Sequence, residues 1–267
     1  MDRIGQYEMK PFSKARENIL LVSHEGKQRN NVYALLEVDV TTARQLIHNA
    51  KGSSDISFTG WIIKCVAQAA NEHRQLNTYR LGRRKIVEFE DVDIPIPIER
   101  EDGTETRPMA YIIRKANQKT VQQITQEIRQ VQHQEVNSST NVLGSDLSRG
   151  EQWMIHAPLF IKKFGLLLVR RRGLLKKKHL GTIGVTSVGM KGRFPGWIIP
   201  LGGPVATLIA VGGISKKPGV NDREITVREY LHLTVTVDHA VVDGGPLARF
   251  VDHLVALLEE GFGLPKS

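Results

Sequence analysis

The sequence contains only one cysteine, Cys65, in 267 residues. A single cysteine excludes an internal disulfide framework and any zinc site built on several cysteines, and we expect no metal. Cys65 lies on the apolar face of a predicted helix, away from any histidine or helix start that would activate it, so we expect it in the core. No basic and apolar leader opens the chain, which predicts a cytoplasmic protein.

Long apolar runs and acidic charge are also scarce. The run Leu166–Val169 is far too short to span a bilayer, which takes about 20 apolar residues. Lysine and arginine number 37 against 28 acidic residues, which gives a formal charge of +9. Such an excess suits nucleic acid, anionic lipid or the polyanionic coenzyme A. Because no aromatic stacking platform or nucleic-acid motif accompanies the charge, we do not expect nucleic acid as a partner.

Hydrophobic residues make up 40% of the chain, enough for a large core, and no internal repeat divides it. Strands are predicted over residues 30–41 and 85–100, the second with prolines that suit an edge, and the final third is rich in strands with glycine turns. Helices are predicted over residues 42–51, 57–77 and 120–134 and at the C-terminal end. This order predicts a one-domain α/β fold with a large, mixed or mainly antiparallel sheet covered by helices.

A histidine stands at the end of the last predicted strand, in the stretch DHAVVDGG from Asp238 to Gly245. Alternating apolar residues before it form one strand face, and Gly244 and Gly245 permit unusual backbone angles in the turn before a helix that has Pro246 in its first turn. A histidine fixed there, His239, can take a proton from a thiol or hydroxyl near neutral pH, as acyl transfer requires. The spacing alone leaves an ordinary core or surface histidine open, since His-x-x-x-Asp occurs by chance in many chains.

The stretch DHAVVDGG resembles the His-x-x-x-Asp-Gly signature in the catalytic domain of dihydrolipoyl acyltransferases from 2-oxo acid dehydrogenase complexes, which chloramphenicol acetyltransferase shares. Other segments resemble that domain in the same order: PFSKARENI, FTGWIIKCVAQAANEHRQLN, KTVQQITQEI, GTIGVTSVGMKG and ATLIAVGGI. We therefore expect residues 1–9 to be an N-terminal extension and residues 10–267 to be the acyltransferase domain. The resemblance implies a chloramphenicol acetyltransferase-like fold, with coenzyme A or acyl-CoA as co-substrate.

The resemblance also implies roles at the site. His239 is the general base that removes the proton from an acceptor thiol, which attacks the acyl thioester directly, without an acyl-enzyme. Thr186 replaces the usual serine and donates a hydrogen bond to the oxyanion, while its strand neighbour Ser187 must face the other way. A buried strand threonine satisfied by the backbone is the alternative for Thr186.

Asp243 is expected to support the site and not to orient the imidazole, because it follows the base by four residues in a tight turn. The resemblance implies a buried structural ion pair between Asp243 and Arg16, next to the turn at Gly244. The joint presence of these residues argues against a catalytically silent trimeric scaffold of the same fold.

The sequence allows three acceptors for the acyl group: a lipoyl group on a separate protein, the arm of a carrier protein, or a small molecule. With a small-molecule acceptor the protein would be an O-acetyltransferase. We expect no lipoyl attachment on this chain, because it begins almost at the catalytic segment. We also expect a homotrimer whose sites lie between subunits, since in the resembled family the histidine and the hydroxyl come from neighbouring chains. The end of the sequence, EEGFGLPKS, offers little apolar surface to join trimers into a cubic or dodecahedral core.

A basic, apolar insert at about residues 150–180 departs from the family pattern. It suits an amphipathic element that lies on a membrane surface or over the active site, and a solvated basic loop packed by its leucines is equally compatible. The basic residues concerned are Lys162, Lys163, Arg170, Arg171, Arg172, Lys176, Lys177 and Lys178.

Overall fold

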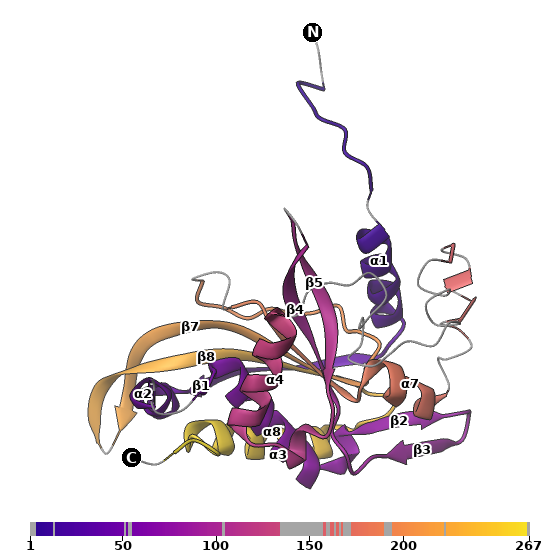
Figure 1. Cartoon of the computed structure of the whole chain (residues 1–267). Coiled ribbons are helices and arrows are strands. Elements are labelled where there is room, and N and C mark those ends of the chain that lie inside the picture. Colours follow the sequence, from indigo (N-terminus) through magenta and orange to yellow (C-terminus); the bar gives the residue numbers. More distant parts are fainter. Residues whose placement is uncertain are drawn as a thin grey trace.

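The computed structural model describes residues 4–12, 14–50, 52, 55–102, 105–133, 157–158, 161–162, 164–165, 167, 172–189, 194–221 and 223–265. The α-helices are α1 (Lys14–Lys27), α2 (Thr41–Asn49), α3 (Phe58–Glu72), α4 (Val121–His133), α7 (Gly173–Leu180) and α8 (Gly244–Glu259). The strands are β1 (Asn31–Asp39), β2 (Thr78–Leu81), β3 (Lys85–Glu88), β4 (Ile94–Asp102), β5 (Glu105–Ile113), β6 (Ile183–Ser187), β7 (Thr207–Asn221) and β8 (Glu224–Asp238). Two short 3-10 helices, Arg74–Leu76 and Ala116–Gln118, complete the order (Figure 1).

The main sheet has four strands in the order β1-β8-β7-β6. β8 pairs antiparallel with both β1 and β7, whereas β6 runs parallel to β7. The strands β2 with β3 and β4 with β5 form two separate antiparallel pairs (Figure 1). The prediction of a mixed sheet covered by helices is therefore confirmed.

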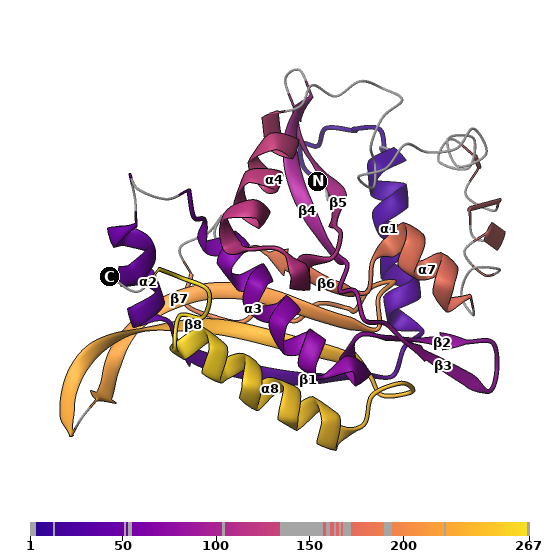
Figure 2. The ribbon, with the colours of Figure 1, turned by 60° about the horizontal axis from the view of Figure 1, so that its bottom comes forward.

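Helices α3 and α8 lie side by side along one face of the main sheet, which we call the inner face (Figure 2). The side chains of β6, β7 and β8 that point toward these helices are apolar and buried: Val185, Ile209, Leu233, Val235 and Val237. Strand side chains alternate between faces, so the residues between them point to the opposite side, which we call the outer face.

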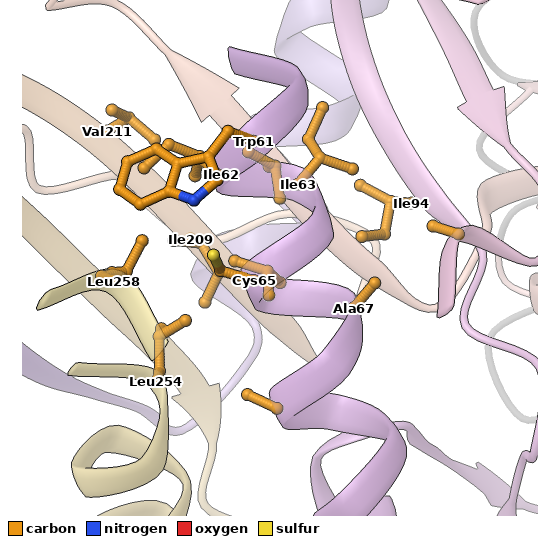
Figure 3. Close-up of a cluster of buried hydrophobic side chains, with 14 of the residues drawn as sticks. Trp61, Ile62, Ile63, Cys65, Ala67, Ile94, Ile209, Val211, Leu254 and Leu258 are labelled. Atoms are coloured by element: carbon orange, nitrogen blue, oxygen red, sulfur yellow. The ribbon is translucent and has the colours of Figure 1, made fainter. Parts of the chain in front are cut away.

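The core gathers between α3, α8 and the inner face (Figure 3). Trp61 of α3 is fully buried, and its indole Nε1 donates a hydrogen bond to the carbonyl oxygen of Phe262 at 3.1 Å. Cys65 lies one turn further along, facing Leu254 and Leu258 of α8 (Figure 3). Burial raises the pKa of the Cys65 thiol well above its ordinary value, because the thiolate would be desolvated. The prediction that Cys65 packs in the core is confirmed.

One predicted element was wrong. The single long strand expected over residues 85–100 is two strands, β3 and β4, which belong to different pairs. The chain turns between them because the Asn77 side-chain amide donates to the carbonyl oxygens of Phe89 and Asp91, and Asn117 accepts from the amide of Val92. These contacts join segments far apart in the sequence, so periodicity could not reveal the break.

The outer face is covered in part by residues 194–203, which have no regular secondary structure. Trp197 donates from Nε1 to the carbonyl oxygen of Leu36 at 2.9 Å, and its ring stacks edge-on against His232 at 4.5 Å. The segment can come close because β7 is irregular at Gly212 and Gly213, where a Cβ on Gly213 would collide with the carbonyl oxygen of Phe194. Among the described residues, the outer face is therefore partly covered by an irregular segment that packs close to β7.

Most of the predicted basic insert lies outside the described residues, but α7 belongs to it. Lys176 is buried, with its ammonium 5.7 Å from the centre of the Tyr79 ring. The Lys177 ammonium donates to the carbonyl oxygen of Asp91 at 2.8 Å and lies 3.8 Å from the carboxylate of Asp93. These two lysines support the fold. They do not belong to an exposed basic surface, although the sequence analysis had counted them among the residues of such a surface. Among the described helices, none has the length and apolarity needed to cross a membrane.

Candidate active site

His239 follows directly on the last residue of β8, where the chain leaves the sheet. Its backbone N–H donates to the carbonyl oxygen of Asn30 at 2.8 Å, which ties it to the residue before β1. The imidazole is 53% exposed. A histidine with a fixed backbone and an open ring is able to exchange a proton with a bound thiol.

Asp243 lies beside His239 and not beside Arg16. One carboxylate oxygen, Oδ1, is 3.8 Å from Nδ1 of His239, which is too long for a hydrogen bond. The Asp243 side chain is 86% exposed, and it occupies the position before α8 without capping the helix through its side chain. No ion pair joins Asp243 to Arg16, which lies exposed on α1, although both residues belong to the described part of the chain. The expected buried pair was wrong for the single chain, because neither side chain is buried within it.

Gly244 and Gly245 do not have the unusual backbone angles that the sequence suggested. Neither has a positive φ, and both are already part of α8. A Cβ at Gly244 would meet no atom within 4 Å, and one at Gly245 would meet only the end of the Arg249 side chain at 3.6 Å. The turn before α8 therefore needs glycine at neither position within one chain. Pro246 lies in the first turn of the helix, as predicted.

Thr186 lies on the outer face of the sheet. In the parallel pair β6–β7 it stands opposite Ala210, and in β7–β8 Ala210 stands opposite Thr234. Ser187, the next residue, points to the inner face, where its hydroxyl is buried without a hydrogen-bond partner in the described part of the chain. Of the two neighbouring residues, Thr186 therefore lies on the face away from the helices, and it is half-buried.

The single chain keeps Thr186 and His239 apart. Thr186 is level with Thr234, which precedes His239 by five residues. Five strand residues at about 3.4 Å each separate the two levels by roughly 17 Å along β8, and Thr186 is also two strands away. The hydroxyl and the imidazole of one chain are therefore too distant to act on the same carbonyl group.

Two further hydroxyls lie on the outer face beside Thr186. The Oγ1 atoms of Thr234 and Thr236 are buried and have no hydrogen-bond partner among the described residues. Around them the surface is apolar and open, and it includes Tyr33, Leu35, Val188, Trp197, Ile199 and Leu201. A buried hydroxyl without a partner costs about 1–3 kcal/mol, so this region is poorly satisfied in an isolated chain.

The sequence analysis missed an ion pair directly next to His239. Asp238 accepts a hydrogen bond at Oδ2 from Arg29 Nη1 at 3.1 Å, and both side chains are nearly buried, at 12% and 10% exposure. Arg29 Nη2 also donates to the carbonyl oxygen of Pro204 at 2.5 Å. Asp238 lies inside the motif DHAVVDGG, so the sequence marked one partner, but Arg29 is more than 200 positions away and no local pattern indicates it.

No resident metal site is found among the described residues, since no group of three or more His, Cys, Asp or Glu side chains is arranged to hold an ion.

The model of the family described as 2-oxoacid dehydrogenases acyltransferase (catalytic domain) matches residues 5–146 and 170–263. The unmatched interval between these stretches falls largely within the predicted insert at about residues 150–180. The match begins at residue 5, within the predicted N-terminal extension.

Relatives with a described function are acyltransferase components of dehydrogenase complexes. The lipoamide acyltransferase component of the branched-chain alpha-keto acid dehydrogenase complex of Bacillus subtilis is 26% identical over 86% of this chain and 46% of its own length. The dihydrolipoyllysine-residue acetyltransferase component of the pyruvate dehydrogenase complex of Rickettsia bellii is 25% identical over 92% of this chain and 51% of its own. The chain thus spans about half the length of these relatives.

Solved structures share the fold over almost the whole chain. A probable dihydrolipoamide acetyltransferase from Listeria monocytogenes superposes with a TM-score of 0.69 at 24% identity, covering 98% of both chains. The dihydrolipoamide acetyltransferase of Azotobacter vinelandii, in which a serine, a histidine and an asparagine were investigated for their role in catalysis, gives a TM-score of 0.69 at 17% identity, covering 97% of this chain and 94% of its own.

Proposed function

The chain belongs to the family of 2-oxoacid dehydrogenase acyltransferase catalytic domains, and on that premise we propose that it transfers an acyl group between coenzyme A and an acceptor thiol. The observation that carries the proposal is His239, which has an anchored backbone and an open imidazole at the end of β8, within the matched stretch 170–263. A lipoyl group is the favoured acceptor, because both relatives described above are named for lipoyl chemistry.

His239 acts as the general base in this proposal. The imidazole takes the proton of the attacking thiol, the sulfur forms a bond to the thioester carbonyl carbon, and the carbonyl oxygen becomes an oxyanion. When the tetrahedral intermediate collapses, the bond between the carbonyl carbon and the sulfur of the donor thioester breaks. The leaving thiolate then receives the proton from the imidazolium. No covalent acyl-enzyme is formed.

Thr186 donates a hydrogen bond to the oxyanion. The proposal is supported by its position on the outer face and by the serine studied in the Azotobacter vinelandii enzyme. Removal of one such donor typically lowers the rate about 10²- to 10³-fold. A threonine presents the same hydroxyl as a serine, with an extra methyl group that narrows the pocket.

The active site is shared between two copies of the chain. The separation of roughly 17 Å along β8 prevents His239 from reaching Thr186 of its own chain, so a neighbour must supply one of the two groups. The exposed apolar side chains of the outer face, such as Leu35 and Ile199, supply surface for such a contact. A closed ring of three chains satisfies this head-to-tail arrangement, and it would also cover the exposed apolar side chains around Thr234 and Thr236.

We expect the assembly to stop at the trimer. Leu264 is buried, Phe262 packs against the core of its own chain, and the Phe262 carbonyl accepts from Trp61. These apolar residues after α8 are therefore already in use within the chain. They are not available to dock into another trimer.

Other functions receive less support. A small-molecule O-acetyltransferase would use the same His239 chemistry on a hydroxyl, and no described pocket residue selects for it. A silent scaffold has no need of an open histidine tied to the end of a strand. A membrane contact through the insert is weakened as a hypothesis, because Lys176 and Lys177 make contacts inside the fold and are not free to bind lipid headgroups. The cytoplasm remains the proposed location.

The decisive experiment compares the chain with its His239→Ala variant in acetyl transfer from acetyl-CoA to dihydrolipoamide, pantetheine and small alcohols. We expect the variant to lose at least about 10³-fold in rate with little change in unfolding temperature. Thr186→Ser should stay active, whereas Thr186→Val should lose about 10²- to 10³-fold. Near-normal turnover of His239→Ala would falsify the mechanism. Tight, salt-sensitive DNA retention without any acyl transfer would favour nucleic-acid binding instead.

A further inference from the structure

The backbone that bears His239 is held by contacts from three separate parts of the chain. Asp238 N–H donates to the carbonyl oxygen of Ala206 at 2.9 Å, and His239 N–H donates to that of Asn30 at 2.8 Å. Arg29 connects the same three segments. Its side chain bonds to Asp238 at the end of β8 and to Pro204 shortly before β7, and Arg29 itself immediately precedes Asn30 before β1. Its guanidinium is therefore the side chain that ties the start of β1, the start of β7 and the end of β8 together.

Asp238 in turn shapes the chain that follows it. Its carboxylate oxygen Oδ1 accepts from the amide of Ala240 at 3.1 Å, and its carbonyl oxygen accepts from the amides of Val241 and Val242 at 2.9 and 3.0 Å. The other carboxylate oxygen, Oδ2, is the one that Arg29 binds. One carboxylate thus fixes the turn on one side and is itself fixed by Arg29 on the other.

We propose that Arg29 is a positioning residue for the general base: through Asp238 it sets the turn from Asp238 to Asp243 and so aims the His239 imidazole. The inference rests on the proposed acyl transfer. Arg29 and Asp238 are nearly buried, so the pair keeps one geometry instead of exchanging with water. Small displacements of a catalytic group lower rates steeply, and about 1 Å can cost 10²-fold.

A second ion pair in the molecule provides a matched control. Arg228 Nε donates to Asp39 Oδ2 at 2.6 Å, and the two side chains are 21% and 19% exposed. This pair also joins β8 to β1, but at the opposite end of the β1–β8 ladder from His239. Its loss should weaken the same ladder without reaching the turn.

The experiment compares Arg29→Met, Arg29→Lys and Arg228→Met in the full chain. For Arg29→Met we expect kcat for acetyl transfer from acetyl-CoA to dihydrolipoamide to fall about 10- to 10²-fold, with KM for acetyl-CoA changed less than about twofold. Arg29→Lys should recover most of kcat, because an ammonium can still pair with Asp238. Arg228→Met should keep kcat within about twofold. If Arg29→Met keeps its kcat, or if Arg228→Met loses as much, the proposal fails.

Hydrogen exchange separates this inference from the proposed function. In Arg29→Met the amides of Ala240, Val241 and Val242 should exchange at least about tenfold faster, and in Arg228→Met they should not. If the unmodified chain transfers no acyl group but Arg29→Met still loosens these amides, acyl transfer is wrong and the positioning of the turn stands. Unchanged exchange overturns the positioning role. If Arg29→Met does not fold, Arg29→Met combined with Asp238→Asn removes both buried charges and is tested in the same way.

Discussion

Leu233 and Thr234 are neighbours in β8, yet they point to sheet faces that are completed in different ways. Leu233 lies on the inner face, where it is fully buried in the core cluster with α3 and α8. Thr234 lies on the outer face, where it is also fully buried, but no described residue pairs with its hydroxyl. Across the sheet, Leu35 stands opposite Thr234 and is 49% exposed. The inner face is complete in one chain, and the outer face is not.

This difference separates stability from function. Apolar burial against α3 and α8 needs nothing beyond the chain itself, and it stabilises the fold in proportion to the area removed from water. The outer face combines Thr186, buried hydroxyls and exposed apolar side chains, which is a poor arrangement for an isolated chain and a suitable one for a surface that a second copy covers. Four substitutions test whether the two faces differ in this way.

The largest effect is expected on the inner face. Leu233→Ala should lower the free energy of unfolding by about 2–5 kcal/mol, because it removes buried methyl groups and leaves a cavity under α3 and α8. Urea unfolding monitored by circular dichroism at fixed protein concentration measures this change. A loss below about 1 kcal/mol would mean that the inner face is less tightly packed than the structure indicates.

Leu35→Lys, on the outer face, should leave the fold of each chain intact and break the assembly. A lysine at this exposed position loses little within one chain, but an ammonium buried between copies is costly to desolvate. Light scattering should show the mass drop from three chains to one, and acetyl transfer should fall with it. A trimer that survives this substitution, or an unmodified chain that is monomeric, would count against the shared site.

Asp39→Asn tests a polar group on the outer face that the chain does satisfy. Burial raises the pKa of Asp39, but hydrogen bonds from Thr41 and the nearby Arg228 guanidinium outweigh burial and hold the pKa below its ordinary value. The stabilisation is therefore present above the unfolded pKa of about 4 and is lost as the pH falls through the lower folded pKa. We expect the variant to be about 0.5–1 kcal/mol less stable at pH 7, and this difference should shrink as the pH falls through the folded pKa of Asp39. A difference that does not shrink on acidification would contradict this origin.

Thr234→Val should have the smallest effect on stability. Valine has nearly the same shape, and the hydroxyl it removes has no partner among the residues that the structure describes, so the free energy of unfolding should stay within about 0.5 kcal/mol or rise. To exclude effects of assembly, the stability of the double variant Leu35→Lys with Thr234→Val is compared with that of Leu35→Lys alone, which is expected to be a monomer. A clear destabilisation there would show that the hydroxyl is satisfied within the chain after all.

Local patterns predicted much of this molecule because they depend on neighbours in the sequence. Helical periodicity located α3 and the buried position of Cys65, and the alternation in β8 placed His239 at a strand end. The pattern over residues 85–100 was misread as one strand, because the turn there is held by Asn77 and Asn117 from outside the segment. The same limit applied to Gly244, whose place in the motif suggested strain that the start of α8 does not have.

The sequence by itself determined the mixed α/β fold through short-range periodicity, and it determined the family and the candidate general base His239 through the resemblance of its motifs to a known family. Only the tertiary structure decided that Arg29 fastens Asp238 beside this histidine, that Asp243 stays exposed instead of pairing with Arg16, and that Thr186 lies far from His239 in the same chain. Strand register and ion pairs join residues up to 209 positions apart, and their energies depend on distances in space that no local pattern records.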